Sequence, residues 1–432
     1  MSAQIYDYLR SENMFYSSQY GFREGHNTEL AVLENIDRVI ENLEKGEIPV
    51  NIFLDLSKAF DTLDHDLLLD KLSHYGIQGN ALKLCESYLT NRKQYVEFNG
   101  SQSTQLTIQT GVPQGSILGP LFFLIYLNDF DRSTNMFKFI TYADDTTLIA
   151  SLSLNMSPRD FEFSLNEELK KVNDWLKINK LSLNVKKTKF MMFHTLNKCI
   201  PQLSLEIEQD QIECVHHFDF LGIIIDKNLT WKAHIEKIEK KIVKILAILN
   251  RLKHYIPVET LRTLYNSLIS PHLLYGILLW GQKNKSITKL QKKAMRLITK
   301  SRYNAHTEPL FKQLRILKVS DLLTLQEWKF YYRLVHKTLP IHFLSTALQR
   351  HSDLHQYPTR YNNRMVIPKL KYQLSLCSVK NRLPRLINQA ANSTLEKVNT
   401  HSLFGIGFYL KRVFISAYSD SCEIINCYIC RR

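Results

Sequence analysis

The chain has 432 residues, of which 44% are apolar and 22% charged, with only 14 Gly and 12 Pro. These proportions exclude disordered and collagenous classes and predict a globular protein of roughly two to four structural units. Net charge is +15, but residues 1–150 carry 11 Lys/Arg against 20 Asp/Glu, whereas residues 151–432 carry 45 against 21. The excess of basic residues in 151–432 favours a polyanionic partner such as nucleic acid; a solvated lysine-rich surface is the alternative.

Hydrophobic periodicity predicts an α+β part followed by a helical part. In chain order it predicts a helix over 28–43, a strand over 50–56, two helices within 64–90, a hairpin over 95–108, a helix over 116–130, a strand-turn-strand over 137–150, a helix over 161–178 and strands over 189–193 and 218–225. After Leu229 the strand signal ends, and we expect mostly helices as far as about Arg350.

Membrane and disulfide signals are weak in this sequence. No apolar run approaches the ~20 residues that a membrane span needs, and the first residues do not form an apolar signal segment. Seven cysteines spread over the chain fit a reducing compartment better than a disulfide framework. Cys422, Cys427 and Cys430 have a spacing found among zinc ligands but no evident fourth ligand, so we expect an unpaired tail. These features predict a soluble intracellular protein.

Three acidic residues are candidates for chemistry. Asp55 ends an apolar strand, where a carboxylate is costly unless a cation or a donor meets it. Asp144 and Asp145 lie between two predicted strands. Each has a simpler interpretation, as a helix cap or as turn formers. If folding brings the three together, their oxygens match the ligands that paired Mg²⁺ ions need for in-line phosphoryl transfer.

A loop rich in glycine and proline follows the predicted hairpin. Residues 110–120, TGVPQGSILGP, hold three glycines and two prolines directly before an apolar helix. Such a loop lets the backbone approach a ligand closely, although an ordinary connecting loop is the alternative. It lacks the Gly-Lys-Ser/Thr ending of a Walker phosphate loop.

These elements in this order resemble the reverse transcriptase of non-LTR (LINE-type) retrotransposons, most closely the jockey type. The matching segments are FLDLSKAFD at 53–61, GVPQGS at 111–116, YADD at 142–145, GFREGHNT at 21–28, LSLNVKKTK at 181–189 and FLG at 220–222. Any one of these segments is a weak pattern, but all six in this order and spacing are specific for the family. The resemblance covers about residues 10–300.

The resemblance implies a right-hand polymerase fold of the α+β class. Partial fingers and an antiparallel palm sheet with helices would occupy residues 1–228. A basic helical thumb would follow at 229–300, and a mostly helical C-terminal extension at 301–432. The family's endonuclease and its first fingers segment are not found in this sequence, which implies an N-terminally truncated element copy or a partial gene model.

The resemblance also assigns roles in the palm. Asp55, Asp144 and Asp145 would be the catalytic carboxylates that hold two Mg²⁺ ions, with Mn²⁺ as an alternative. Phe60 would exclude a ribose 2′-hydroxyl and so select deoxynucleotides, because an apolar ring can neither accommodate nor hydrogen-bond the extra oxygen. Arg23 would grip the triphosphate as a bidentate donor.

Further implied contacts involve the nucleotide, the pyrophosphate and the duplex. Gln114 and Gly115 would contact the nucleotide and template. Lys187, favoured over Lys189, would neutralise or protonate the pyrophosphate. A thumb helix would track the duplex backbone without reading its sequence, through Lys237, Lys240, Lys241 and Lys244.

The function implied is RNA-directed DNA polymerase: deoxynucleoside triphosphates extend a DNA primer on an RNA template. The partners would be RNA, DNA and dNTPs, without a membrane and with an endonuclease supplied in trans, and the location would be the nucleus. Two alternatives stay open at this point. In the first, the chain is a catalytically inactive remnant that only binds nucleic acid. In the second, it is an RNA-dependent RNA polymerase that incorporates ribonucleotides.

Overall fold

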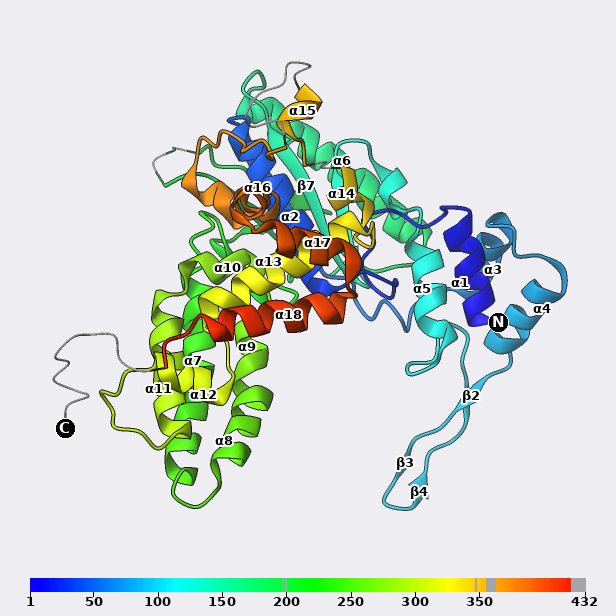
Figure 1. Ribbon diagram of the computed structural model, residues 1–432. Helices are drawn as coiled ribbons and strands as arrows, with labels where there is room; N and C mark the ends of the chain where they lie inside the picture. The colour runs from blue at the N-terminus through cyan, green and yellow to red at the C-terminus, as the bar shows by residue number, and fades with distance from the viewer. Residues whose placement is uncertain (197, 199, 346–347, 355–362, 421–432) are drawn as a thin grey trace. The chain divides into compact units, whose positions relative to one another are not determined.

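The computed structural model describes residues 1–196, 198, 200–345, 348–354 and 363–420 (Figure 1). Contacts divide the chain into two compact units, Met1–His216 and His217–Arg432. The finer division expected at residues 228 and 300 remains a prediction. The cysteine-rich tail lies outside the described residues. Among the helices that are described, none is long and apolar enough to cross a membrane.

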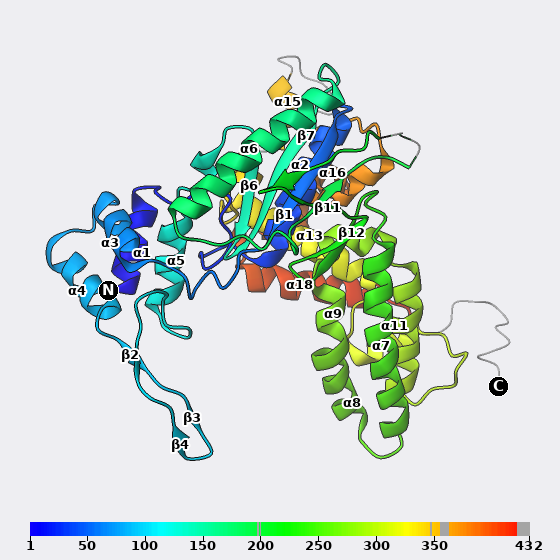
Figure 2. The ribbon, with the colours of Figure 1, turned by 180° about the vertical axis from the view of Figure 1, so that it is seen from behind.

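A five-stranded sheet forms the centre of the first unit, with β1 as its middle strand. The strand order is β11-β8-β1-β7-β6, for β1 Ile48–Leu54, β6 Lys138–Tyr142, β7 Asp145–Leu152, β8 Lys189–Met192 and β11 Glu213–Cys214 (Figure 2). β1 runs antiparallel to both β7 and β8, and β11 adds a short parallel pairing at the edge. All seven residues of β1 are buried, so both faces of the sheet are covered.

Helices cover the two faces of this sheet. α2 (Thr28–Glu44) begins where the Asn27 side chain accepts a hydrogen bond from the Leu30 amide, and it packs against β1 and β6. α5 (Leu118–Leu127) and α6 (Pro158–Ile178) share the core formed by Val50 and Ile52. The remaining helices of the unit are α1 (Ser2–Ser11), α3 (His65–His74), α4 (Gly79–Leu89) and the 3-10 turn η1 (Phe130–Ser133).

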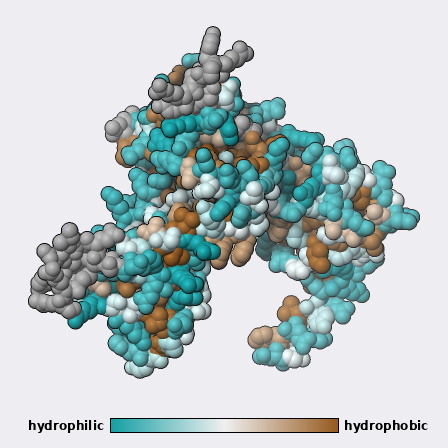
Figure 3. All heavy atoms as spheres, viewed as in Figure 1, coloured by the Kyte–Doolittle hydropathy of each residue, from teal (hydrophilic) through white to brown (hydrophobic). Residues whose placement is uncertain are grey.

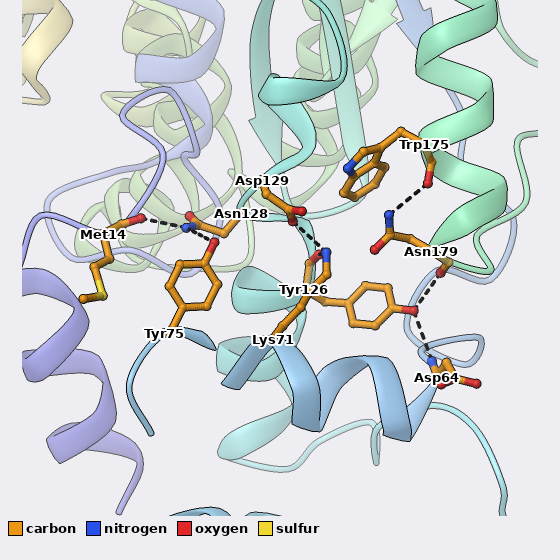
Figure 4. Close-up of polar contacts among 9 residues, drawn as sticks. All are labelled: Met14, Asp64, Lys71, Tyr75, Tyr126, Asn128, Asp129, Trp175 and Asn179. Atoms are coloured by element: carbon orange, nitrogen blue, oxygen red, sulfur yellow. Dashed lines mark hydrogen bonds and ion pairs between the residues drawn. The ribbon is translucent and has the colours of Figure 1, made fainter. Parts of the chain in front are cut away.

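A half-buried lysine joins three of these helices beside the sheet (Figure 4). The Lys71 ammonium on α3 donates to the Tyr126 carbonyl (2.7 Å) and to Asp129 (2.6 Å), and it lies 4.8 Å from the Trp175 ring centroid on α6. Burial lowers the pKa of Lys71, and Asp129 partly offsets this effect. The Tyr126 hydroxyl on α5 donates to the Asn179 carbonyl at 2.7 Å. The helices beside the sheet are therefore joined by polar contacts as well as by packing.

The predicted hairpin extends from the first unit as two short ladders. β2 (Lys93–Gln94) pairs with β5 (Leu106–Thr107), and β3 (Glu97–Phe98) pairs with β4 (Ser101–Gln102). Its turn residues, Asn99 and Gly100, both have positive φ, which a tight two-residue hairpin turn requires. Figure 3 shows hydrophobic side chains along it, and Phe98 is 75% exposed.

The second unit begins with a hairpin and continues as helices. β12 (His217–Phe220) and β13 (Ile223–Asp226) precede α7 (Lys232–Leu252), which packs mainly against α11 (Lys285–Ile298). The other elements are α8 (Val258–Leu264), the π-helix η2 (Tyr265–Ile269), α9 (Ser270–Leu274), α10 (Ile277–Trp280), η3 (Gly281–Lys283), α12 (Glu308–Leu314), α13 (Val319–Val335), α14 (Ile341–Ser345), α15 (His351–Leu354), η4 (Gln373–Cys377), α16 (Val379–Gln389), α17 (Asn392–Thr400) and α18 (Leu403–Ser416).

The predicted elements are confirmed with small shifts at their ends. Three features differ: residues 218–225 form a hairpin and not one strand, α1 precedes the first predicted helix, and β9 (Glu206–Ile207) pairs with β10 (Asp210–Gln211). Strands of two residues are too short to show alternation. α1 buries only Ile5 and Leu9, so its apolar periodicity is weak.

Candidate active site

The paired strands β1 and β7 bring Asp55 and Asp145 to the same end of the sheet. β1 pairs with β7 from Ile48 opposite Leu152 to Leu54 opposite Thr146; Asp55 directly follows Leu54, and Asp145 directly precedes Thr146. The two carboxylates are close enough to interact electrostatically. Two acids that are distant in sequence are thus neighbours at one end of the sheet.

Asp144 reaches the same end through a tight turn. β6 and β7 pair as far as Tyr142 opposite Asp145, which leaves Ala143 and Asp144 as the two loop residues. Ala143 has a φ of 55°, in the left-handed region. Gly21 packs against this turn: a Cβ at Gly21 would lie 2.4 Å from the Ala143 nitrogen. The segment before Gly21 continues the sheet, because the Tyr20 amide donates to the Thr141 carbonyl at 2.7 Å.

The three carboxylates interact electrostatically. Desolvation, followed by the negative charges of Asp144 and Asp55, raises the pKa of Asp145 to about 6, although the residue itself is exposed. Within the described residues no three His, Cys, Asp or Glu side chains lie close enough to form a ready metal-binding group. The acids are therefore neighbours whose carboxylates do not converge on one point.

A loop from residues 182 to 189 fixes the backbone around Asp55. The Asp55 carbonyl accepts from the Asn184 amide at 2.8 Å, and its amide lies 3.4 Å from the buried Thr188 hydroxyl. This brings the Lys187 ammonium to 3.6 Å from the Asp55 carboxylate, while its side chain stays 69% exposed. Lys189 instead pairs with Glu213 at 2.8 Å. Only Lys187 of this pair faces the acids.

Phe60 lies between two other aromatic rings. Its ring stacks on Phe123 of α5, with centroids 4.1 Å apart and planes at 16°, and meets Phe22 edge-on at 6.0 Å. Phe60 is half-buried and Phe22 is 48% exposed. Packing on a helix of the core holds the Phe60 ring in one orientation.

The glycine-rich loop is attached to the same segment. The Gly111 and Val112 amides donate to the Leu63 and Phe60 carbonyls at 2.7 and 3.0 Å. A Cβ at Gly111 would come within 2.8 Å of several Asp61 backbone atoms, so this approach requires glycine. The exposed Gln114 amide donates to the Asp61 carboxylate at 2.9 Å. Gly115 follows with a φ of 81° and open space around it.

Arg23 makes hydrogen bonds to backbone carbonyls that the sequence did not indicate. Its Nη1 donates to the carbonyls of Tyr16 (2.6 Å) and Gln19 (3.2 Å), and the guanidinium lies 5.3 Å from the Phe15 ring centroid. Burial lowers the pKa of Arg23. The half-buried Arg23 side chain therefore stabilises the loop that leads to Gly21. The triphosphate contact assigned to it remains a prediction.

The four lysines predicted on α7 are not alike. Lys240, Lys241 and Lys244 are exposed. Lys237 is held at the tip of the β12–β13 hairpin, where its ammonium contacts Asp219 at 2.6 Å and the Gly222 carbonyl at 3.1 Å. Lys237 therefore supports the hairpin, and its role in binding nucleic acid remains a prediction together with that of the other three.

The acids at the end of β1 and β7 have the chemistry that a divalent cation requires. They are carboxylates, the ligands that Mg²⁺ prefers, and the pKa of Asp145 is raised by desolvation and then by the charges of Asp144 and Asp55, both of which a bound cation would offset. Asp55 is 39% exposed, so an ion has access from solvent.

Sequence comparison agrees with this geometry. Residues 1–225 match the family model described as reverse transcriptase (RNA-dependent DNA polymerase), so the chain belongs to the reverse transcriptase family and its palm has the α+β polymerase fold. Among individual relatives it is similar to the probable RNA-directed DNA polymerase from transposon BS of Drosophila melanogaster, with 28% identity over 74% of this chain and 36% of the relative.

The jockey-type resemblance is confirmed in the same way. The RNA-directed DNA polymerase from mobile element jockey of Drosophila melanogaster is 27% identical over 78% of this chain and 38% of that protein. The chain thus spans little more than a third of these relatives. Among solved structures, apo telomerase from Candida tropicalis has 12% identity and a TM-score of 0.37 over 79% of this chain and 58% of its own, a likeness too slight to support an argument.

Three residues with clear roles in the site were not predicted. Gly21 fits against the acidic turn, Thr188 contacts the Asp55 amide, and the buried His65 ring lies 2.8 Å from the Gly111 carbonyl. Gly21 and Thr188 fall inside segments already recognised by resemblance. Their importance depends on contacts between distant segments, which no local pattern shows.

Proposed function

We propose that this chain is an RNA-directed DNA polymerase that extends a DNA primer with dNTPs on an RNA template. The observation that supports the proposal is the pairing of β1 with β7 up to Leu54 and Thr146, which brings the adjacent Asp55 and Asp145 to one end of the sheet, with Asp144 on the adjoining turn. Phe60 and Gln114 lie on segments joined to the same region by hydrogen bonds.

Asp55, Asp144 and Asp145 would hold two Mg²⁺ ions, or Mn²⁺ in their place. When bound, such a pair activates the primer hydroxyl and stabilises the charge on the departing pyrophosphate. Two side chains of the protein would act beside the metal ions. The Phe60 ring excludes a 2′-hydroxyl, and the Lys187 ammonium beside Asp55 offsets negative charge or supplies a proton to the leaving group.

Primer extension tests this function. Purified, folded protein should extend a DNA primer on RNA with dNTPs and Mg²⁺, and it should reject ribonucleotides. No product with either Mg²⁺ or Mn²⁺ would favour the inactive remnant, and ribonucleotide incorporation would favour an RNA polymerase. A second measurement does not depend on turnover: Mn²⁺ binding followed by electron paramagnetic resonance should be lost in Asp55→Asn. A nuclear location and an endonuclease in trans remain inferences from the resemblance alone.

A further inference from the structure

A groove in the second unit has features that the polymerase site does not use. α13 packs against both α17 and α18, and a groove of about 580 Å³ lies between the end of α17 and the outer face of α18. Its lining includes Lys397, His401, Phe408, Tyr409 and Arg412, and no Asp or Glu.

Aromatic rings and cations lie together in and beside this groove. Phe408 lines it and is 58% exposed, and Phe404, one helical turn earlier on α18 and next to the lining residue Gly405, is 83% exposed. The Lys397 ammonium lies 3.6 Å from the Tyr409 ring centroid, and the Arg412 guanidinium lies 6.0 Å from that of Phe408. Two large rings exposed to water beside two cations are an unusual arrangement for a surface that has no ligand.

A second groove of the same volume shows that this charge pattern is specific. It lies between α6 and the β9–β10 pair, and it also carries an exposed aromatic ring, Phe163 (69%). Its lining holds five acids, Glu162, Glu167, Asp174, Glu206 and Glu208, against three basic residues, Arg159, Lys170 and Lys177. This groove is therefore acidic on balance, and a polyanion would favour the α17–α18 groove over it.

We propose that the α17–α18 groove binds single-stranded RNA, with bases stacked on Phe404 and Phe408 and phosphates paired with Lys397 and Arg412. Stacking on protein rings requires bases that are not already stacked in a duplex, which selects single strands. The cations favour a phosphate backbone over an uncharged apolar peptide. RNA is chosen because the proposed function already supplies an RNA strand, and to that extent the inference rests on it.

Fluorescence anisotropy of a labelled oligouridylate with the full chain tests the proposal. The double variant Phe404→Ala/Phe408→Ala should lower the affinity at least about tenfold, since each stacked base contributes substantially. The matched control Phe163→Ala should stay within about twofold of the parent. Lys397→Gln/Arg412→Gln should reduce the slope of log affinity against log salt by about 1.4, because two phosphate contacts with a single strand are lost.

Several outcomes would overturn the proposal. They are an unchanged affinity in the double aromatic variant, an equal loss of binding to an RNA–DNA duplex, tighter binding of the matching DNA strand than of the RNA, or equal binding of polyglutamate at the same rings. The last result would identify a protein-docking surface. Asp55→Asn should bind oligouridylate normally, and the double aromatic variant should still extend a primer on a short template, so failure here is distinguishable from failure of the polymerase function.

Discussion

The acids of the first unit and the lysines of the second unit are fixed in different ways. Asp55 directly follows the central strand of a five-stranded sheet, and hydrogen bonds to Asn184 and Thr188 hold its backbone. Lys240, Lys241 and Lys244 extend from one helix into solvent, and no ion pair is seen for them among the described contacts. The chemistry of phosphoryl transfer requires precise positions, whereas a duplex backbone can be bound by mobile charges. Substitutions should therefore cause large losses in the first unit and graded ones in the second.

Removal of one carboxylate charge should have the largest effect. Asp55→Asn keeps the size of the side chain but loses the charge, and we expect primer extension to slow by at least about a hundredfold. Asp70→Asn, on the exposed face of α3, is the matched control and should leave the rate unchanged. Steady-state extension assays measure both. Equal activity of Asp55→Asn and the parent would remove Asp55 from the site.

Gly21→Ala should disturb the site without touching any acid. The added methyl group would collide with the Ala143 backbone and move the turn that carries Asp144. A shift of about 1 Å can cost on the order of a hundredfold in rate. The melting temperature, measured beside the extension rate, separates this displacement from unfolding. A variant that is stable and fully active would show that the turn does not need its present position.

Phe60→Ala should relax sugar selection. Without the ring, discrimination against ribonucleotides should fall by about ten- to a hundredfold, with a smaller change for dNTPs. Phe22→Ala, which removes the edge-on neighbour but leaves Phe60 stacked on Phe123, is the control. The ratio of kcat/KM values for dUTP-type and UTP-type substrates measures the effect. If the Phe60→Ala variant still rejects ribonucleotides, the assignment of Phe60 to sugar selection is wrong.

The exposed lysines should produce a graded effect. The triple change of Lys240, Lys241 and Lys244 to Gln should weaken binding of an RNA–DNA duplex and reduce its salt slope by about 3. Lys237→Gln should reduce the slope by less than about 1, because Asp219 and the Gly222 carbonyl already hold its ammonium, and it should lower the stability of the β12–β13 hairpin, because these two contacts are lost. Titrations at several salt concentrations give the slopes. An equal slope change in both variants would contradict the division between them.

The smallest expected effect is a pH-dependent loss of stability in the second unit. Burial, with Lys237 and Lys241 adding to it, lowers the pKa of His234 to about 4. The unfolded chain therefore binds more protons than the folded chain between pH 6.5 and 4, and the free energy of unfolding should fall by about 2 kcal/mol from pH 8 to pH 5.

Tryptophan fluorescence during urea unfolding reports this change, since three of the four tryptophans lie in the second unit. His234→Asn should flatten the pH profile, while the exposed His216→Asn should not. A parent profile that is flat between pH 8 and 5 would contradict the assignment.

Much of the palm is predictable from sequence because its signals are local. The alternation around Asp55, the Asn99-Gly100 turn and the two acids between strands each indicate an element without knowledge of the rest. The register of the strands cannot be predicted from such local signals. It depends on which strands pair, and sequence alternation alone does not bring Asp55 and Asp145 to the same end of the sheet.

The contacts that individual side chains make were harder to predict than the secondary-structure elements that carry them. Lys237 and Lys241 are equivalent on a helical projection, yet only Lys237 meets an acid from the preceding hairpin. Arg23 has the residue type of a phosphate ligand, but the carbonyls of a nearby loop occupy one of its nitrogens. Both differences arise from segments that approach only in the folded chain.

The central position of β1 also has a consequence for biosynthesis. β1 is made early, but both of its neighbours, β7 and β8, come from segments that the ribosome releases much later. Until they arrive, this strand, which is buried along its whole length in the folded unit, has both edges unpaired, a condition that favours aggregation of nascent chains. Slow, non-local pairing of this kind predicts that yield in a heterologous host will depend on chaperones and on low temperature more than on codon choice.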